Sequence, residues 1–441
     1  MGKGQKEAAE MAHVELVVCP HCWSKFPPAD ALWISEHSDL MGDPRLGPEH
    51  PRRFRPDRFD PTGAALDFRN FPCRRLACPQ CHLEVPHAYF EAPSFFISVV
   101  GAPACGKSYF LTSMTWRLRA ILPKEFALLF SDAHNLFNRR LQEYEAALFL
   151  HPNPNALVNL PKTEVHGDIY FAVLKDGQPS QYLIPFVFKV SPAANHPLAD
   201  KADKFARVLT IYDNAGESYL PGQDSVANPV TRHLGASDGI FFLFDPLQDV
   251  RFRKRLPSNL TDKDVGGLAR VGYQQIPLRQ EVILHEMLRR TEMYRPALRG
   301  NTPIRLIVVV TKLDIWAPLL DGPLPWVWKS AGNISGVATS EIEEVSRRVQ
   351  KLLEETCPEV VGAALTACPS CLFIPVSSTG TAPEMDPASG QSGFRPAKIR
   401  PMWVEVPILY CLSHWAKGLV GTIRPKAAVS KTDSPDGKLS G

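Results

Sequence analysis

The stretch SVVGAPACGKSYFLTS, residues 98–113, joins an apolar run to an amphipathic run through a turn that contains two glycines. Its middle, GAPACGKS at 101–108, fits the pattern G-x-x-x-x-G-K-S in full. This pattern belongs between a buried strand and a helix, because the loop amides and the first helical turn then point at one anion. The stretch therefore predicts a phosphate-binding loop, followed by a helix from Lys107 to about Leu122.

Each position of the loop has a physical task. Gly101 and Gly106 let the backbone curl around a phosphate. Lys107 reaches the terminal phosphates of a nucleotide triphosphate, and the Ser108 hydroxyl completes a Mg²⁺ shell. The residues expected to contact the nucleotide here are Gly101, Ala104, Cys105, Gly106, Lys107, Ser108 and Tyr109.

The composition is that of an ordinary globular protein, with 441 residues, 44% apolar and 22% charged. The net charge of +3 is too small to indicate binding to nucleic acid or to an anionic membrane. No run approaches the ~18 apolar residues of a transmembrane segment, and the N-terminus lacks the apolar core of a secretory signal. We therefore expect a cytoplasmic protein whose ten cysteines stay reduced.

Two Cys-x-x-Cys pairs, CPHC and CPQC, indicate a zinc site. Their cysteines are Cys19, Cys22, Cys78 and Cys81. Cys73, His21 and His82 are close enough in sequence to be alternative ligands, and unpaired structural cysteines are the plain alternative. We predict that residues 1–91 form a zinc ribbon, with a Pro- and Arg-rich insert at 41–63.

From residue 92 the pattern changes to apolar runs that alternate with helical periodicity. This predicts an α/β domain over 92–422, with a mostly parallel sheet and helices on both faces. In detail, residues 131–149 are expected to be a helix capped by Ser131 or Asp132. The runs DIYFAVLK and QYLIPFVFKV are expected to pair as a hairpin that gives the sheet one antiparallel edge. The polar tail 423–441 is expected to be disordered.

Three short motifs stand at the ends of later apolar runs: DNAGE at 213–217, TKLD at 311–314 and PVSS at 375–378. Open α/β sheets bind ligands at the carboxyl ends of their strands, so we expect these motifs to gather around the phosphate loop. Asp213 could hold Mg²⁺ through water, and Gly216 could donate its N–H to a terminal phosphate.

The last two motifs suit recognition of a base. Asp314 could accept hydrogen bonds from the N1–H and the amino group of guanine, while the Lys312 stem lies against the base plane. Ser377 and Ser378 could present backbone N–H groups to the guanine O6. Thr311 completes this group of expected contacts.

The ordered set resembles the motifs of the translation-factor-related (TRAFAC) class of P-loop GTPases. The zinc ribbon, the long inserts and the DNAGE form resemble the bacterial double-GTPase families within that class. The resemblance covers residues 93–420 and implies a Ras-like P-loop NTPase domain that binds GTP or GDP with Mg²⁺. It also implies a slowly hydrolysing molecular switch in a bacterial signalling or conflict system, with an effector or a second GTPase as its partner.

Several positions depart from the pattern of that class. Thr311 replaces the usual Asn of the base motif, and Thr163 is the best candidate for the first-switch Thr that binds Mg²⁺. Glu217 stands where many GTPases place a water-orienting Gln, so it either slows turnover or acts as a general base. The catalytic candidates are therefore Lys107, Thr163 and Glu217. No motif marks an arginine finger among Arg139, Arg140 and Arg232.

Two other functions remain open on the sequence: an ATP-using P-loop enzyme, and a nucleotide-stabilised scaffold that does not hydrolyse. The CPSC run at 368–371 reads as buried core rather than a second metal site. The basic run RFRKR at 251–255 reads as a solvated loop.

Overall fold

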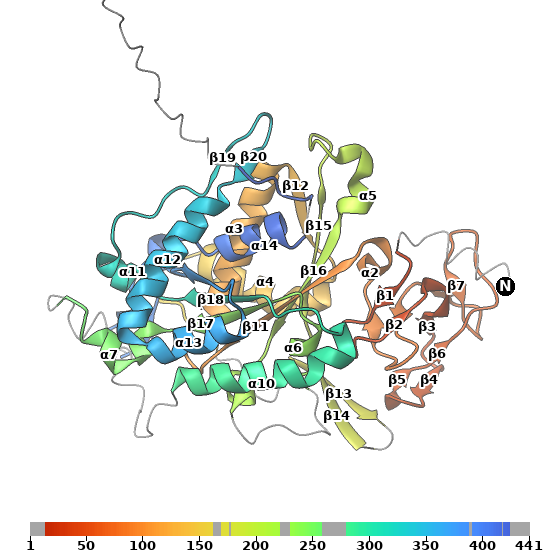
Figure 1. The fold of residues 1–441 in the computed structure, drawn as a ribbon. Helices are drawn as coiled ribbons and strands as arrows, with labels where there is room; N and C mark the ends of the chain where they lie inside the picture. Colours follow the sequence, from red (N-terminus) through yellow and green to blue (C-terminus); the bar gives the residue numbers. More distant parts are fainter. Residues whose placement is uncertain are drawn as a thin grey trace, which may run out of the picture.

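A seven-stranded sheet lies at the centre of the protein (Figure 1). The structure is a computed structural model that describes residues 14–161, 169–175, 178–220, 230–257, 279–387, 390–416 and 418–423. The strand order is β12-β15-β16-β11-β17-β18-β21. The bounds are β11 Ser94–Gly101, β12 Leu128–Asp132, β15 Phe186–Pro192, β16 Arg207–Asp213, β17 Gly239–Phe244, β18 Leu306–Val310 and β21 Leu372–Pro375. The five strands from β16 to β21 are parallel, whereas β15 is antiparallel to both of its neighbours.

The central strand β11 is buried on both faces, as its continuous apolar run SFFISVV predicts. Phe95, Ile97 and Val99 pack into one apolar cluster. Phe96 and Val100 point to the opposite face, where they join two other clusters. Because side chains alternate along a strand, this one run builds the core on both sides of the sheet.

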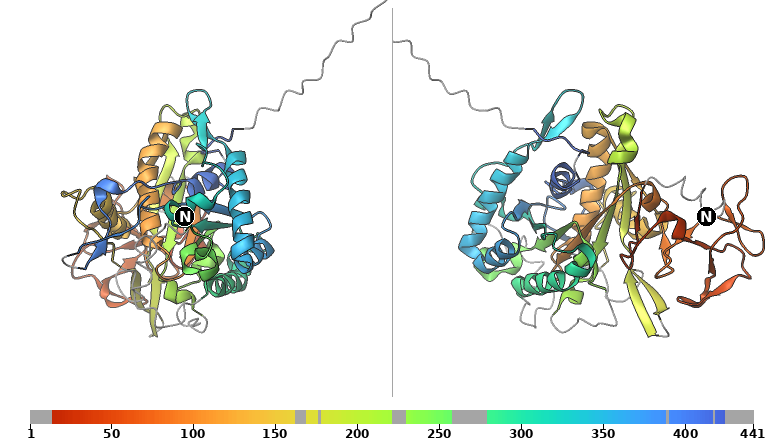
Figure 2. Two further views of the ribbon diagram at one scale, coloured as in Figure 1. Left: turned by 90° about the vertical axis from the view of Figure 1, so that its left-hand side faces the viewer. Right: turned by 45° about the vertical axis from the view of Figure 1, so that its right-hand side comes forward.

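Helices cover both faces of the sheet (Figure 2). One face carries α3 (Lys107–Phe126), α4 (Asn135–Phe149) and α14 (Val406–His414), and the other carries α10 (Gln280–Arg299), α12 (Thr339–Thr356) and α13 (Pro358–Ala367). The shorter helices are α2 Ala88–Glu91, α5 Ala202–Phe205, α6 His233–Ala236, α7 Val250–Arg253 and α11 Leu313–Trp316. The expectation of a mixed α/β fold with a mostly parallel sheet is therefore confirmed.

The cysteine-rich segment forms short strands beside the sheet (Figure 1). Their bounds are β1 Val17–Val18, β2 Lys25–Phe26, β3 Leu32–Ile34, β4 Met41–Asp43, β5 Gly47–Pro51, β6 Arg53–Phe54, β7 Ala65–Leu66, β8 Pro72–Cys73, β9 Leu76–Ala77 and β10 Glu84–Val85. β10, β9, β3 and β6 make one small sheet, and the others pair as β1-β2, β4-β5 and β7-β8. Further pairs are β13 (Tyr170–Lys175) with β14 (Gln178–Leu183), β19 (Trp328–Ser330) with β20 (Ser335–Val337), and β22 (Glu384–Met385) with β23 (Ser392–Gly393).

This segment shares one apolar cluster with the large sheet, which includes Phe26 and Val85 from the segment and Val208 and Tyr212 from β16. A buried hydrogen bond of 3.0 Å from Trp23 Nε1 to the Tyr212 hydroxyl joins the two parts. The cysteine-rich segment is thus packed directly onto the strand that ends at Asp213.

Two local predictions were wrong. Ser131 and Asp132 belong to strand β12, and helix α4 begins only at Asn135, where the His134 side chain accepts a hydrogen bond from the Phe137 N–H. β12 forms because it pairs with β15, and Phe130 stacks on Phe188 across that pair. Such pairing is a long-range contact that helical periodicity does not reveal.

The predicted second strand of the hairpin is divided in two. β14 ends at Leu183 and pairs with β13, whereas β15 begins at Phe186 and enters the large sheet. Pro185 separates them, because proline lacks an N–H and restricts the residue before it. The antiparallel edge of the sheet therefore comes from β15 and β12, and the hairpin is a separate sheet.

Within the described part of the chain, every helix falls short of the length and apolar character that a bilayer-spanning segment needs.

Candidate functional site

The loop between β11 and α3 has the curled backbone that its sequence predicts. Ala104 and Gly106 adopt positive φ values of 61° and 95°. A Cβ atom on Gly101 would lie 2.7 Å from both Cys105 Sγ and the Leu243 carbonyl oxygen. Only glycine fits at that position, so the loop turns tightly against β17.

Lys107 begins α3 and folds back over the loop. Its side chain is buried, and its Nζ donates hydrogen bonds to the Gly101 and Ala102 carbonyls at 2.9 and 3.2 Å. A cationic group, an N-terminal helix end and a curled backbone are therefore combined in one place, which is an arrangement suited to an anion. The Tyr109 hydroxyl is engaged elsewhere, since it donates to Asn159 and accepts from the Leu160 N–H.

Asp213 ends the neighbouring strand β16 and is 2% exposed. Its Oδ2 lies 3.5 Å from Arg140 Nη2, and its Oδ1 has no hydrogen-bond partner among the described residues. Burial raises the pKa of Asp213, while the charges of Arg140 and Lys107 act in the opposite direction. A buried carboxylate oxygen without a partner is costly and suits a ligand or a cation.

Gly216 lies directly against the loop, as its motif predicts. A Cβ atom on this residue would come within 2.7 Å of the Pro103 nitrogen and 2.9 Å of the Gly101 carbonyl oxygen. The backbone after β16 therefore contacts the backbone after β11, and the absence of a side chain makes this approach possible.

The residues expected to read a base also lie together, after β18 and β21. The Ser377 hydroxyl donates to Asp314 Oδ1, and the Leu313 N–H donates to the Val376 carbonyl at 3.0 Å. Burial raises the pKa of Asp314, and the bond from Ser377 opposes this shift. The Ser377 N–H donates to the Met402 carbonyl at 2.9 Å, so it is already used within the chain.

Three further contacts fix this second group of residues. Lys312 has a positive φ of 59°, and its Nζ forms a 2.6 Å ion pair with Asp245 at the end of β17. The Thr311 hydroxyl donates to the Phe244 carbonyl at 3.3 Å. The Ser378 carbonyl accepts a 2.7 Å hydrogen bond from Ser113 on α3.

The four motifs thus stand at the carboxyl ends of β11, β16, β18 and β21, which share one edge because these strands are parallel. Thr163 and the side chain of Glu217 lie outside the described residues, as does the tail from 424 onwards. The sequence did not single out Asp245, although this acidic residue ends an apolar run just as Asp213 does.

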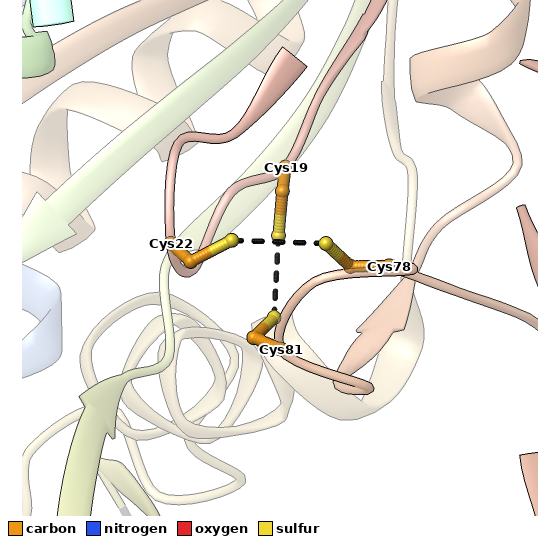
Figure 3. Close-up of side chains that lie close together, drawn as sticks. All are labelled: Cys19, Cys22, Cys78 and Cys81. Atoms are coloured by element: carbon orange, nitrogen blue, oxygen red, sulfur yellow. Dashed lines mark hydrogen bonds between the residues drawn. The ribbon is translucent and has the colours of Figure 1, made fainter. Parts of the chain in front are cut away.

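The four predicted zinc ligands come together from two separate turns (Figure 3). Their sulfur atoms lie within 4.8 Å of one another, and both the Cys19–Cys81 and the Cys22–Cys78 Sγ distances are 3.7 Å. Zinc with bonds of about 2.3 Å to a sulfur tetrahedron would give sulfur separations of about 3.8 Å. Burial raises the pKa of the Cys19 thiol, so a cation is needed to ionise this group fully. The cluster can therefore bind zinc.

The three side chains considered as alternative zinc ligands make contacts with other residues. His82 pairs with Asp43 at 2.8 Å, His21 Nε2 lies 3.0 Å from the Glu84 carbonyl, and Cys73 donates to Asp67. Cys368 and Cys371 are buried in the core beneath α13, as expected from the sequence.

No family model matches this chain. Among curated proteins, it is similar to the putative ESX-1 scaffolding and assembly protein SaeC of Mycolicibacterium smegmatis, with 23% identity over 270 residues. The match covers 56% of this chain and 62% of the relative, so the chain spans about three fifths of the length of that protein.

Proposed function

We propose that this chain has a P-loop NTPase fold, binds a guanine nucleotide at the carboxyl edge of its sheet and acts as a nucleotide-dependent switch toward a protein partner. One observation carries the proposal: the motifs at 101–108, 213–216, 311–314 and 377–378 meet at that edge although they are far apart in the chain. A chance match to one motif would not bring the other three to the same place.

The residues around the loop fit the phosphates and a hard cation. Lys107 would exchange its bonds with the two loop carbonyls for bonds to phosphate oxygens. Ser108 and Asp213 would hold Mg²⁺, and Asp213 Oδ1, which has no partner among the described residues, would supply the oxygen ligand that this cation prefers. Gly216 would donate its N–H, since its backbone already lies on the loop.

The residues after β18 and β21 fit guanine. A carboxylate accepts two parallel hydrogen bonds, and guanine offers two adjacent donors at N1 and its amino group. Ser377 fixes the orientation of Asp314, and Asp245 fixes the position of Lys312. Adenine lacks this pair of donors, which is why the base motif favours GTP or GDP over ATP.

The name of the mycobacterial relative favours a second function, a scaffold that nucleotide stabilises without being hydrolysed. That relative is named for scaffolding and assembly, and the match is partial and distant. A switch and a scaffold both need protein partners, and they differ in whether the bound triphosphate turns over. Hydrolysis measured with and without a partner protein separates them.

Competition binding tests the proposal. GTP, ATP and XTP would each displace a fluorescent GDP analogue from the wild-type chain and from Asp314→Asn. We expect GTP to displace the probe best from the wild type. Asp314→Asn should weaken GTP by about 2–4 kcal/mol and favour XTP, which replaces a donor of guanine with an acceptor.

Asp321→Asn is the matched control, because this aspartate is exposed on the loop after α11 and should leave all affinities unchanged. A wild-type chain that binds no guanine nucleotide would refute the proposal. Displacement by ATP as effective as by GTP would instead favour the ATP-using enzyme.

A further inference from the structure

Arg140 is held at the sheet edge by the packing of α4. Two residues before it, the Asn138 side chain donates to the Val187 carbonyl at 2.8 Å and accepts from the Val187 N–H at 2.7 Å. Farther along the helix, Glu145 bonds to Thr115 at 2.7 Å and thereby ties α4 to α3. The helix is therefore anchored on both sides of Arg140, to β15 and to the helix that follows the loop.

The guanidinium of Arg140 lies beside Asp213, at the carboxyl end of β16. The Nη2 atom of Arg140 is 3.5 Å from Asp213 Oδ2, which is a long contact. The Cζ atom of Arg140 lies 5.0 Å from the centre of the Phe186 ring. Its Nη1 is buried and has no hydrogen-bond partner among the described residues. Asp213 Oδ1 likewise has no partner within the part of the chain that the structure describes.

A buried guanidinium nitrogen without an acceptor costs free energy, so its presence needs a reason. The ring of Phe186 gives the guanidinium a cation–π contact but offers no oxygen or nitrogen acceptor for Nη1. Asp213 takes up only part of the donor capacity of Arg140, at a distance too long for a strong ion pair. The remaining donor is therefore available to a third group next to Asp213.

We propose that Arg140 is a catalytic arginine supplied by the chain itself, whose Nη1 contacts an oxygen of the terminal phosphate of the bound nucleotide. This inference rests on the proposed function. In the step that it assists, a water oxygen bonds to the γ-phosphorus as the bond to the β–γ bridging oxygen breaks. The bridging electrons stay on GDP, and the water protons pass to the phosphate and to solvent.

The other two arginines considered for this role lie elsewhere. Arg139 is 64% exposed and faces Glu143 one turn along the helix at 3.8 Å. Arg232 lines a cavity together with Cys22 and Tyr182, beside the four-cysteine cluster. The contacts of both residues are thus away from Asp213 and from the loop at 101–108.

The test compares Arg140→Ala and Arg140→Lys with Arg139→Ala, a neighbouring change on the exposed side of the same helix. Two equilibrium affinities are measured for each protein: GDP with Mg²⁺, and GDP with Mg²⁺ and aluminium fluoride, which imitates a phosphoryl group in transfer. Single-turnover hydrolysis of GTP is the third measurement. Arg140→Ala should leave the GDP affinity within about threefold of the wild type. It should lower the affinity for GDP with aluminium fluoride and the rate of GTP hydrolysis by about 10³-fold each.

Arg140→Lys should recover little, because a lysine lacks the planar fork, and Arg139→Ala should behave as the wild type. Unchanged aluminium fluoride binding in Arg140→Ala would overturn this inference while leaving guanine binding in place. Equal losses of GDP affinity and of aluminium fluoride affinity would also overturn it, since Arg140 would then serve only the shape of the site. Absence of GDP binding to the wild type would instead remove the proposed function.

Discussion

The four-cysteine cluster and the edge of the large sheet differ in how far their polar groups are satisfied by the protein. In the cluster, four sulfur atoms from two turns face one another at tetrahedral spacing. At the sheet edge, Asp213 and Arg140 each have one buried polar atom that meets no hydrogen-bond partner among the described residues. Closed sets of ligands are typical of structural metal sites, and unsatisfied groups are typical of sites that take a ligand.

The two regions are physically connected. The Tyr212 hydroxyl donates to the Pro20 carbonyl at 2.6 Å and accepts from Trp23. Pro20 lies within the Cys19–Cys22 turn of the cluster, and Trp23 follows it directly. Asp213 is the residue after Tyr212 in the chain. The four-cysteine cluster therefore supports the strand that carries Asp213.

Removing the zinc ligands should have the largest effect. The wild-type chain should carry about one zinc ion. Cys19→Ser or Cys78→Ser should abolish zinc binding and lower the free energy of unfolding by about 5 kcal/mol or more. Because the cluster segment shares a core with β16, we expect nucleotide affinity to fall as well. Metal analysis, thermal unfolding and a GDP titration measure the three quantities.

Cys73→Ser is the control, because Cys73 is buried in the same segment but bonds to Asp67 rather than joining the cluster. It should keep the zinc. Nucleotide affinity that survives the loss of zinc unchanged would mean that the two regions are independent.

Acid should destabilise the region between the two sites through His233. Burial lowers the pKa of His233 to about 3 in the folded chain, against about 6.5 when unfolded. The unfolded chain therefore binds the proton more readily, so stability is full above pH 6.5 and is lost as the pH falls toward 3. Between pH 7 and pH 4.5 the loss of stability from this group is about 2.5 kcal/mol.

The ring of His233 contacts the hydroxyls of Ser98 and Tyr219 and stacks on the ring of Tyr212, all of which are uncharged. Denaturant unfolding of the wild type and of His233→Gln at both pH values measures the effect. His21, whose pKa burial lowers to about 4, adds its own acid sensitivity to both proteins. A pH dependence that is the same in both proteins would contradict the role of His233.

A smaller effect should follow from filling the space beside the loop. Gly216→Ala places a Cβ within 3 Å of loop backbone, so the loop must shift and nucleotide affinity should fall by about 1–3 kcal/mol. Gly362→Ala is the matched control, because a Cβ there meets nothing within 4 Å on helix α13. That change should raise stability by about 0.5–1 kcal/mol and leave nucleotide binding alone. Equal nucleotide affinities in both variants would argue against a ligand at the loop.

The smallest effect should come from Arg251, in the basic run after β17. Arg251 is bonded to Asp249 and Glu359 at 2.9 Å, but it is half exposed, so the pairs are screened by water. Arg251→Ala should change the free energy of unfolding by less than about 1 kcal/mol and should not alter GDP affinity. A large loss of GDP affinity would extend the ligand site to this surface.

The sequence by itself determined the features that depend on neighbouring residues. Residues 94–126 had to form a buried strand, a curled loop and a helix, because the apolar run, the two glycines and the following periodicity each act locally. The two Cys-x-x-Cys pairs predicted the zinc site, and the structure decided between their thiols and the alternatives Cys73, His21 and His82. The order of the motifs after later apolar runs also placed Gly216 and Asp314 at the carboxyl edge of the sheet, since parallel strands end on the same side.

Only the tertiary structure decided which strands and side chains became neighbours. The run at 128–132 became a strand because β15 lay beside it, and β15 left the hairpin to do so. Arg140 has no motif around it, yet α4 carries it to Asp213, which is 73 positions later in the chain. Contacts of this kind depend on the packing of whole helices against a sheet, and a side chain held by such packing leaves no local pattern in the sequence.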